Sequence, residues 1–303
     1  MAIARREYFG KLLEPGLSDI FYEVFDEIPT LYQELYNVAS TDQPYEEDLS
    51  IGSMGEFPKF EGTVEYDRMY QGYSKVYDFP EYAKGFQIER KLYDDEKYGI
   101  INKKPVGLAT RAVRKMEEHG AALFNNAFDT DYTGPDGKAL CVTDHPSKAY
   151  VDAGEGPEER SNKGTLALSH SALQTTKNLM RNTRDDRGFR ISVVPDTLLV
   201  PVAQEELAWS LIQSDKVINS SDKNPNIHEG RYKLMVWDEL TNDDAWFLID
   251  SRYMKMFLKW FNRVPIEFAM EEEFDTLVAK FRAYMRYECG WSDWVWIYGQ
   301  DAS

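Results

Sequence analysis

Hydrophobic and polar positions divide the chain into stretches with different periodicities. Apolar side chains recur at intervals of three and four over residues 104–128, which predicts one long amphipathic helix with Pro105 in its first turn. Residues 281–289 alternate between apolar and polar, which predicts a half-buried antiparallel strand. Residues 294–298 are apolar on both faces, so we expect a strand covered on two sides. These elements indicate an α+β fold.

Shorter periodic stretches predict the remaining elements. Aromatic residues at helical spacing in residues 1–40, interrupted by Pro15 and Pro29, predict two short helices rather than one long helix. The other predicted elements are a helix over 171–184 that opens with a capping box at Ser171 and Gln174, a helix after Pro201, and strands at 189–193, 198–200, 232–237 and 245–249.

Residues 43–93 form a polar, tyrosine-rich segment that contains repeated glycines and no long apolar run. Such a segment cannot bury a core of its own. Long segments of this kind are uncommon inside compact domains and are usually functional or ordered by a partner. We therefore expect this part of the chain to be covered by another molecule.

Composition and charge exclude several classes of protein. The chain has 303 residues, and its 52 acidic against 35 basic side chains give a formal charge of −17. This charge excludes a protein that mainly binds nucleic acid by neutralising phosphates. The two cysteines lack a CxxC partner, so a disulfide framework is not expected and a reducing compartment is. The sequence shows neither a signal peptide nor a membrane span, and no membrane partner is predicted.

Candidate chemistry along the chain is sparse. GxSxG, HExxH, Walker A and GxGxxG patterns are missing, so we predict no enzymatic activity and no cofactor. The loop after residue 128 resembles the first half of a calcium-binding EF-hand loop, with Asp129, Asp131 and Asp136 as candidate ligands. Leu140 stands where the bidentate glutamate would be needed, so an ordinary aspartate and glycine turn is the favoured interpretation.

Cys141 and His145 offer the one enzyme alternative, a cytosolic hydrolase with a thiol nucleophile. A catalytic Cys–His pair is normally assembled from distant segments, and four residues of loop provide no orienting geometry. Surface or hydrogen-bonded histidines are the favoured interpretation.

The order of several motifs resembles one known family over nearly the whole chain. The motifs are FNNAFD, GPDGKALCVTDHP, ALQTTKNLMRNTRDDRGFRISVVPDTLLVPVAQEELAWSLI, WFLIDS and FRAYMRYECGWSDWVWIYGQD. Together they resemble the major capsid protein of tailed DNA bacteriophages, in particular the Mu-like major head subunit family. Each motif alone is weak, whereas five in this order are fairly specific.

The resemblance implies the Hong Kong 97 phage capsid fold and a division of the chain. The implied parts are an N-terminal arm at 1–42, an extended loop at 43–92, a peripheral domain with a long spine helix at 93–129 and 263–303, and an axial domain at 130–262. Both cysteines should be reduced, with Cys141 in an axial-domain loop and Cys289 on the inner face of a peripheral strand.

The implied function is structural. The chain would self-assemble into pentamers and hexamers of an icosahedral head, assembled in the host cytoplasm, that encloses double-stranded DNA without sequence-specific binding. Only about forty residues precede the extended loop, so a separate scaffolding protein is expected, together with a portal and a decoration or cement protein. An encapsulin-like nanocompartment that holds protein cargo is the alternative shell.

Two groups of residues are predicted to make contacts in such a shell. In the extended loop, aromatic side chains would anchor on a neighbour while charges set the register. These predicted subunit-interface residues are Glu47, Asp48, Phe57, Phe60, Tyr66, Arg68, Tyr70 and Lys75. The resemblance also implies a loop at the capsomer axis, with Asp222, Lys223, Asn224 and His228.

Overall fold

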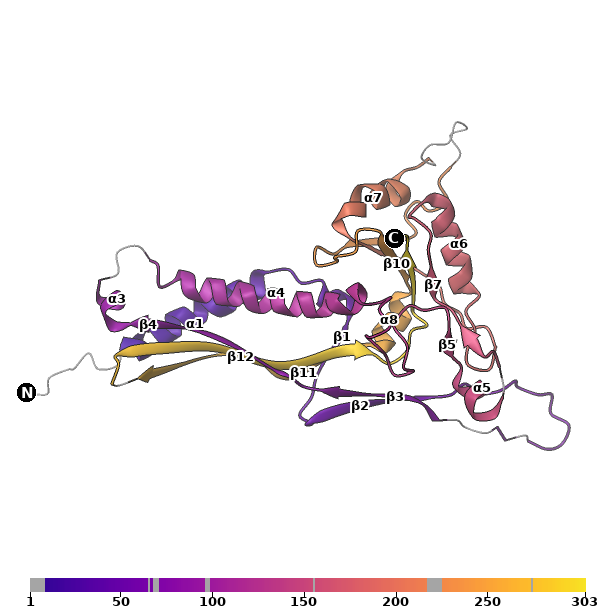
Figure 1. Ribbon diagram of the computed structural model, residues 1–303, viewed down its shortest axis with the longest axis horizontal. Coiled ribbons are helices and arrows are strands. Elements are labelled where there is room, and N and C mark those ends of the chain that lie inside the picture. The colour runs from indigo at the N-terminus through magenta and orange to yellow at the C-terminus, as the bar shows by residue number, and fades with distance from the viewer. Residues whose placement is uncertain are drawn as a thin grey trace, which may run out of the picture.

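The computed structural model describes residues 9–64, 66–67, 71–95, 99–154, 156–216, 225–273 and 275–303. Figure 1 shows a long body of helices and strands, a second body at one end of it, and a narrow ribbon below both. None of the described helices is long and apolar enough to cross a membrane.

The long body is a four-stranded sheet with helices on one face (Figure 1). Its strand order is β1 (Asn37–Ser40), β11 (Leu258–Glu273), β12 (Val278–Trp291) and β4 (Glu81–Glu89). Only β1 pairs in parallel. The helices are α1 (Phe9–Glu27), α2 (Tyr32–Leu35), α3 (Arg90–Asp94) and α4 (Lys103–Asn125). Apolar side chains of α1 and α4 pack on β11 and β12, so this sheet face is buried.

Two strong sequence predictions are confirmed in this body. The long helix is α4, and the alternating strand lies within β12, where every second side chain from Ala279 to Cys289 is buried. The N-terminal prediction is wrong in one respect, because Pro15 lies inside α1 and the first helix ends near Pro29.

The second body is a five-stranded sheet flanked by helices. Its order is β7 (Lys163–Gly164), β13 (Ile297–Asp301), β10 (Ala245–Ile249), β8 (Thr197–Val200) and β9 (Lys233–Val236). The associated elements are α5 (Lys148–Ala153), α6 (His170–Arg181), η1 (Val202–Gln204), α7 (Glu205–Gln213), α8 (Ser251–Phe257), and the short pair β5 (His145–Pro146) and β6 (Glu159–Arg160).

Three local predictions in this body need correction. Ser169, rather than Ser171, caps α6 by accepting a hydrogen bond from the Ala172 backbone N–H at 3.2 Å. Residues 189–193 form no strand, because this stretch returns from a turn and makes only an isolated bridge between Arg184 and Arg190. The last strand begins at Ile297, after a turn at 294–296.

One hydrophobic core joins the two bodies. The Phe124 ring, at the end of α4, lies 5.7 Å from Trp237, 5.6 Å from Phe247 and 6.2 Å from Trp296, measured between ring centroids. The same core includes inward-facing residues of β12. The long helix therefore links the long sheet to the second sheet through aromatic packing.

Candidate functional site

A two-stranded ribbon extends below both bodies (Figure 1). It consists of β2 (Tyr45–Ile51) and β3 (Gln71–Asp78), which pair with each other as a sheet of two strands. The predicted interface residues Asp48 and Lys75 are cross-strand partners, and Glu47 is exposed beside them. An isolated two-stranded ribbon is at best marginally stable in water, so this ribbon depends on contacts beyond itself.

The root of the ribbon is fixed by aromatic contacts. Tyr77 is 1% exposed, and its ring centroid lies 5.1 Å from that of Phe261 on β11. The ammonium nitrogen of Lys75 lies 5.8 Å from the ring centroid of Trp291 on β12. The ribbon is thus held at its base by the long sheet.

The tip of the ribbon carries uncovered aromatic side chains. Phe57 is 101% exposed, Phe60 70% and Tyr66 92%. A polar contact joins the tip to the second body. Asp67 accepts a hydrogen bond from Arg187 Nη1 at 2.9 Å. This contact leaves the aromatic side chains in solvent. The predicted interface residues Arg68 and Tyr70 lie outside the described residues.

The predicted capsomer-axis residues are placed only in part. Asp222, Lys223 and Asn224 lie outside the described residues. His228 is fully buried, with its ring centroid 4.4 Å from that of His170. Burial, together with the nearby His170, lowers the pKa of His228 to about 4.

The three candidate calcium ligands make separate contacts. Asp129 Oδ1 accepts a hydrogen bond from the backbone N–H of Asp131 at 2.9 Å, as in an aspartate turn. Asp136 Oδ2 lies 2.6 Å from Nδ1 of His145. Asp136 Oδ1 also accepts a hydrogen bond from the Lys138 backbone N–H at 3.1 Å, so Asp129 and Asp136 both make contacts typical of turns.

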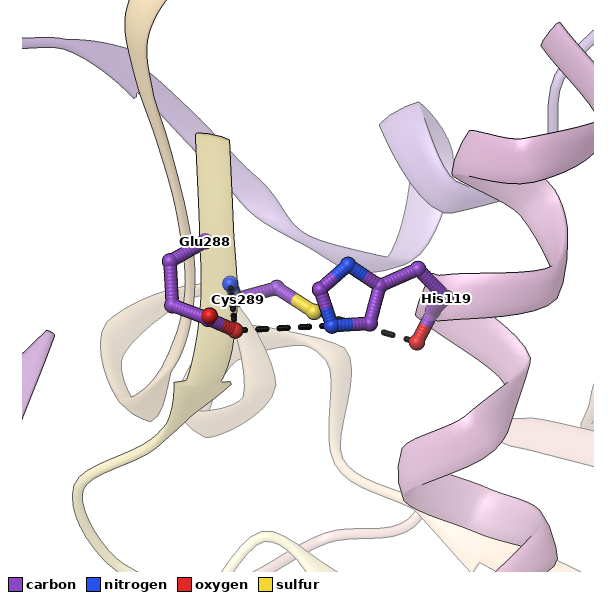
Figure 2. Close-up of side chains that lie close together, drawn as sticks. All are labelled: His119, Glu288 and Cys289. Atoms are coloured by element: carbon purple, nitrogen blue, oxygen red, sulfur yellow. Dashed lines mark hydrogen bonds and ion pairs between the residues drawn. The ribbon is translucent and has the colours of Figure 1, made fainter. Parts of the chain in front are cut away.

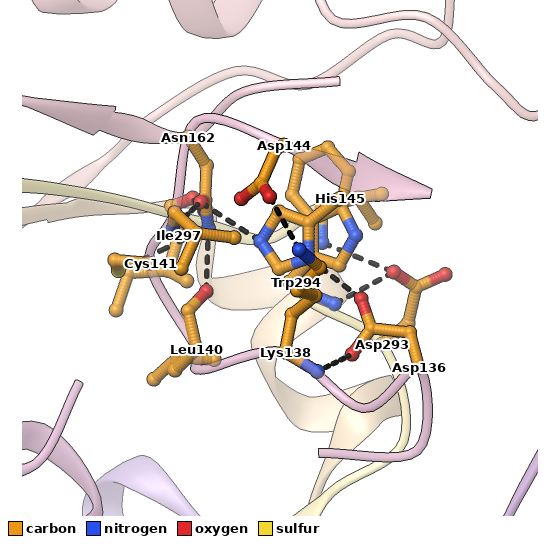
Figure 3. Close-up of polar contacts among 12 residues, drawn as sticks. Asp136, Lys138, Leu140, Cys141, Asp144, His145, Asn162, Asp293, Trp294 and Ile297 are labelled. Atoms are coloured by element: carbon orange, nitrogen blue, oxygen red, sulfur yellow. Dashed lines mark hydrogen bonds and ion pairs between the residues drawn. The ribbon is translucent and has the colours of Figure 1, made fainter. Parts of the chain in front are cut away.

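A buried polar network surrounds His145, and sequence reasoning did not identify it (Figure 3). His145 is fully buried and stacks on Trp294, with ring centroids 4.2 Å apart. Its Nε2 lies 3.1 Å from Asn162 Oδ1. Asn162 also accepts from the Val142 N–H at 3.0 Å, and its amide group donates to the carbonyl of Leu140 at 2.8 Å. The network holds the loop after α4 against the second body.

Cys141 and His145 do not form a nucleophile and base. Both ring nitrogens of His145 face oxygen acceptors, on Asp136 and Asn162, so neither is aimed at the thiol. Cys141 is fully buried, and burial raises the pKa of its thiol well above the usual range. The thiol is therefore protonated and inaccessible, which argues against the hydrolase. Cys141 and Cys289 are both free, as expected.

A second polar cluster, which the sequence also did not reveal, lies between α4 and β12 and consists of His119, Glu288 and Cys289 (Figure 2). These residues are brought together from opposite halves of the chain.

Comparison with known proteins decides the family. The model of the phage capsid protein family matches residues 72–299, which is most of the chain. The chain belongs to the phage capsid protein family. No curated protein matches this capsid protein.

Solved structures share the fold of this capsid protein at low sequence identity. A chain of the bacteriophage PhiM1 mature capsid matches with a TM-score of 0.59 and 8% identity over 90% of this chain and 87% of that one. A chain of the bacteriophage JBD30 procapsid matches with a TM-score of 0.53 and 14% identity over 99% and 77%. A virus-like particle from Pyrococcus furiosus matches with a TM-score of 0.55 and 9% identity over 95% and 98%.

This capsid protein has the Hong Kong 97 fold and a structural role in a capsid shell. The Mu-like subfamily and the division into arm, loop, peripheral and axial parts stay predictions. The pairing of β4 with β12 favours an extended loop that ends near Asp78 rather than at residue 92, because residues 81–89 lie within the long sheet.

Proposed function

We propose that this capsid protein assembles into pentamers and hexamers of an icosahedral head and that the β2–β3 ribbon makes the contact between neighbouring copies. The observation that supports the proposal is the exposure of Phe57, Phe60 and Tyr66 on a ribbon without a core. Rings of one chain use heterologous contacts, in which a projecting element of each copy covers a different surface of the next.

The energy available from such a contact is substantial. Burial of one large apolar side chain contributes about 1.5–3 kcal/mol. Three exposed aromatic side chains per copy, repeated around every ring, then offset much of the entropy lost on association. Glu47, Asp48 and Lys75 would select the register, because opposite charges favour one alignment and like charges oppose others.

The charge of the protein suits a container for DNA. A formal charge of −17 opposes adhesion of double-stranded DNA to the shell wall. Salt limits this repulsion to about 8–10 Å, so it does not prevent dense packing inside. We expect the subunit to have no turnover of its own. It would assemble in the host cytoplasm with a separate scaffolding protein and a portal, and reside in the virion.

Decoration by a second protein belongs to the same proposal. The JBD30 capsid, which matches with a TM-score of 0.53, is decorated with minor capsid protein trimers. A decoration or cement protein on the present shell is expected by analogy. An encapsulin-like compartment is the second candidate, since a virus-like particle, rather than a phage head, from Pyrococcus furiosus shares the fold. Nucleic acid in purified particles would favour the phage head, and packaged protein would favour the compartment.

A double variant, Phe57→Ser and Phe60→Ser, tests the role of the ribbon. We expect an unchanged unfolding temperature of the free subunit, because both side chains are exposed, and loss of rings and shells in electron micrographs. Val202→Ser is the control, since Val202 is 52% exposed on η1 in the second body. Normal shells from the double variant, or equal loss in both variants, would contradict the proposal.

A further inference from the structure

Three side chains with metal-binding groups meet where α4 runs beside the end of β12 (Figure 2). His119 projects from α4, and Glu288 and Cys289 are adjacent on β12. His119 Nε2 lies 3.5 Å from Glu288 Oε1, and Cys289 Sγ lies 3.9 Å from the carbonyl oxygen of His119. One ligand atom from each residue lies within 4.8 Å of the others.

The local backbone explains how two adjacent strand residues reach one point. Cys289 faces α4, whereas its neighbour Glu288 would ordinarily face away from it. The last pair between β12 and β4 is Arg286 with Glu81, so the edge of β12 is open beyond it. Glu288 Oε1 therefore accepts a hydrogen bond from the Cys289 N–H at 2.9 Å while it also approaches His119.

The surroundings of the cluster are aromatic and largely dry. The His119 ring centroid lies 5.4 Å from Tyr287 and 6.2 Å from Trp260. Burial lowers the pKa of His119 to about 4, so its imidazole is neutral and can offer a lone pair. Burial also raises the pKa values of the Glu288 carboxyl and the Cys289 thiol, so both groups would gain from a nearby cation. The side chains of His119 and Glu288 are 17% and 24% exposed, which leaves an entry path.

Two buried polar atoms next to the cluster have no hydrogen-bond partner among the described residues. They are His119 Nδ1 and the hydroxyl oxygen of Tyr77. The Tyr77 ring lies against Gly290, where an added Cβ would approach its Cε1 to 3.0 Å, so the tyrosine adjoins Cys289 along the strand. Buried polar groups are nearly always paired, so each of these two atoms leaves a hydrogen bond unmade beside the cluster.

We propose that this cluster binds one divalent transition-metal ion of the Zn²⁺ type through His119 Nε2, a Glu288 carboxylate oxygen and Cys289 Sγ. Nitrogen, oxygen and sulfur ligands together suit Zn²⁺, whereas Ca²⁺ and Mg²⁺ take oxygen ligands. Ligand atoms around tetrahedral Zn²⁺ lie roughly 3.3–3.8 Å apart. The separation of His119 Nε2 and Glu288 Oε1, 3.5 Å, already lies in this range. Cys289 Sγ, which lies within 4.8 Å of both, would move toward them, and water would complete the fourth position.

The proton balance of binding is simple. The Cys289 S–H bond breaks, its proton passes to solvent, and the sulfur–metal bond forms. The metal would be bound by the tautomer with its proton on Nδ1, which leaves the Nε2 lone pair for the ion. Because the ligands come from α4 and β12, the ion would fasten the long helix to the central strand beside the root of the ribbon. This site goes beyond the shell function and does not depend on assembly.

Cobalt binding to the purified full-length subunit tests the site. After treatment with a chelator and dialysis, Co²⁺ is added and the absorption spectrum is recorded. We expect one Co²⁺ per chain, the near-ultraviolet band of a cobalt–thiolate bond, and displacement of Co²⁺ by Zn²⁺. The absence of the thiolate band from the wild-type spectrum would overturn the proposal without the use of any variant.

The two buried cysteines provide a matched pair of variants. Cys289→Ser should lose the thiolate band, whereas Cys141→Ser should retain it, because Cys141 lies apart from the cluster beside Asn162. His119→Gln and Glu288→Gln should each weaken Zn²⁺ binding about 100-fold or more, since even partners outside the ligand set contribute about 10- to 100-fold. A band that survives in Cys289→Ser, or affinity unchanged in both of the other variants, would contradict the assignment.

Discussion

At the scale of single residues, burial and hydrogen bonding separate groups that resemble one another in the sequence. His145, His228 and His119 all appear in polar surroundings in the sequence, yet the first two are fully buried and the third is half-buried. Sequence reasoning favoured structural roles for histidines. It could not find the cluster of His119 with Cys289, because their contact depends on how a helix packs beside a strand far along the chain. Asn162 stands in a stretch of sequence typical of a turn. Nothing in that stretch indicated that its side chain is the centre of a buried hydrogen-bond network.

Replacement of Asn162 by alanine should strongly destabilise the subunit. The side chain bonds to the Val142 N–H, the Leu140 carbonyl and His145, and its loss leaves these buried groups unpaired. An unpaired buried group costs about 1–3 kcal/mol, so we expect a loss of about 3 kcal/mol in the free energy of unfolding. Denaturant unfolding measures it.

Asn178→Ala is the matched control for this variant. Asn178 is exposed on α6 and makes no side-chain hydrogen bond within the described chain, so its replacement should change the free energy of unfolding by at most about 0.5 kcal/mol. Similar losses from the two variants would show that the buried network does not stabilise the fold.

Acid should destabilise the subunit in part through His228. Its pKa is about 4 in the folded chain, because of burial and the neighbouring His170, and near 6.5 when unfolded. The unfolded chain therefore binds this proton first, and the free energy of unfolding falls as the pH is lowered from about 6.5 to 4. Denaturant unfolding at several pH values should show a shallower fall for His228→Gln. The pKa of His119 is also lowered to about 4, so part of the pH dependence of the free energy of unfolding should remain in this variant. Identical slopes would contradict the assignment.

At the scale of elements, periodicity in the sequence predicted the helices and strands that bury the same face along their length. The helix α4 and the strand β12 meet this condition. The long strand β11 does not, because its register shifts between Asn262 and Glu267, around Pro265, and its faces are mixed in burial. Residues 189–193 alternate as a strand does, but they find no continuous partner strand.

Two glycines of α4 should respond oppositely to the same substitution. Gly107 has open space around it, so Gly107→Ala should raise the free energy of unfolding by about 0.5–1 kcal/mol through helix propensity. At Gly120 an added Cβ would approach Tyr32 Cβ to 3.1 Å and Trp237 to 3.2 Å. Crowding of a packed core costs about 1–3 kcal/mol, so Gly120→Ala should be less stable than the wild type. Thermal unfolding compares the two variants. Equal stabilisation by both would refute close packing of α4 at Gly120.

At the scale of the whole molecule, the residues predicted a segment that needs a partner, while the fold was predicted through family resemblance. Tyr77 packs on the long sheet at the root of the ribbon, whereas the aromatic side chains at its tip, Phe57, Phe60 and Tyr66, are exposed and form no core. The prediction that Phe57, Phe60 and Tyr66 lie at a subunit interface came from the composition of this segment, and it stays a prediction. The joining of two sheets by one core around Phe124 could not be predicted, since it depends on contacts between distant segments.

Electron microscopy of the purified subunit tests the central claim most directly. The account predicts five- and six-membered rings or closed shells, formed from copies of the one chain, with scaffolding protein added where the subunit alone stops at rings. A protein that remains strictly monomeric across protein and salt concentrations, with or without scaffolding protein, would contradict it.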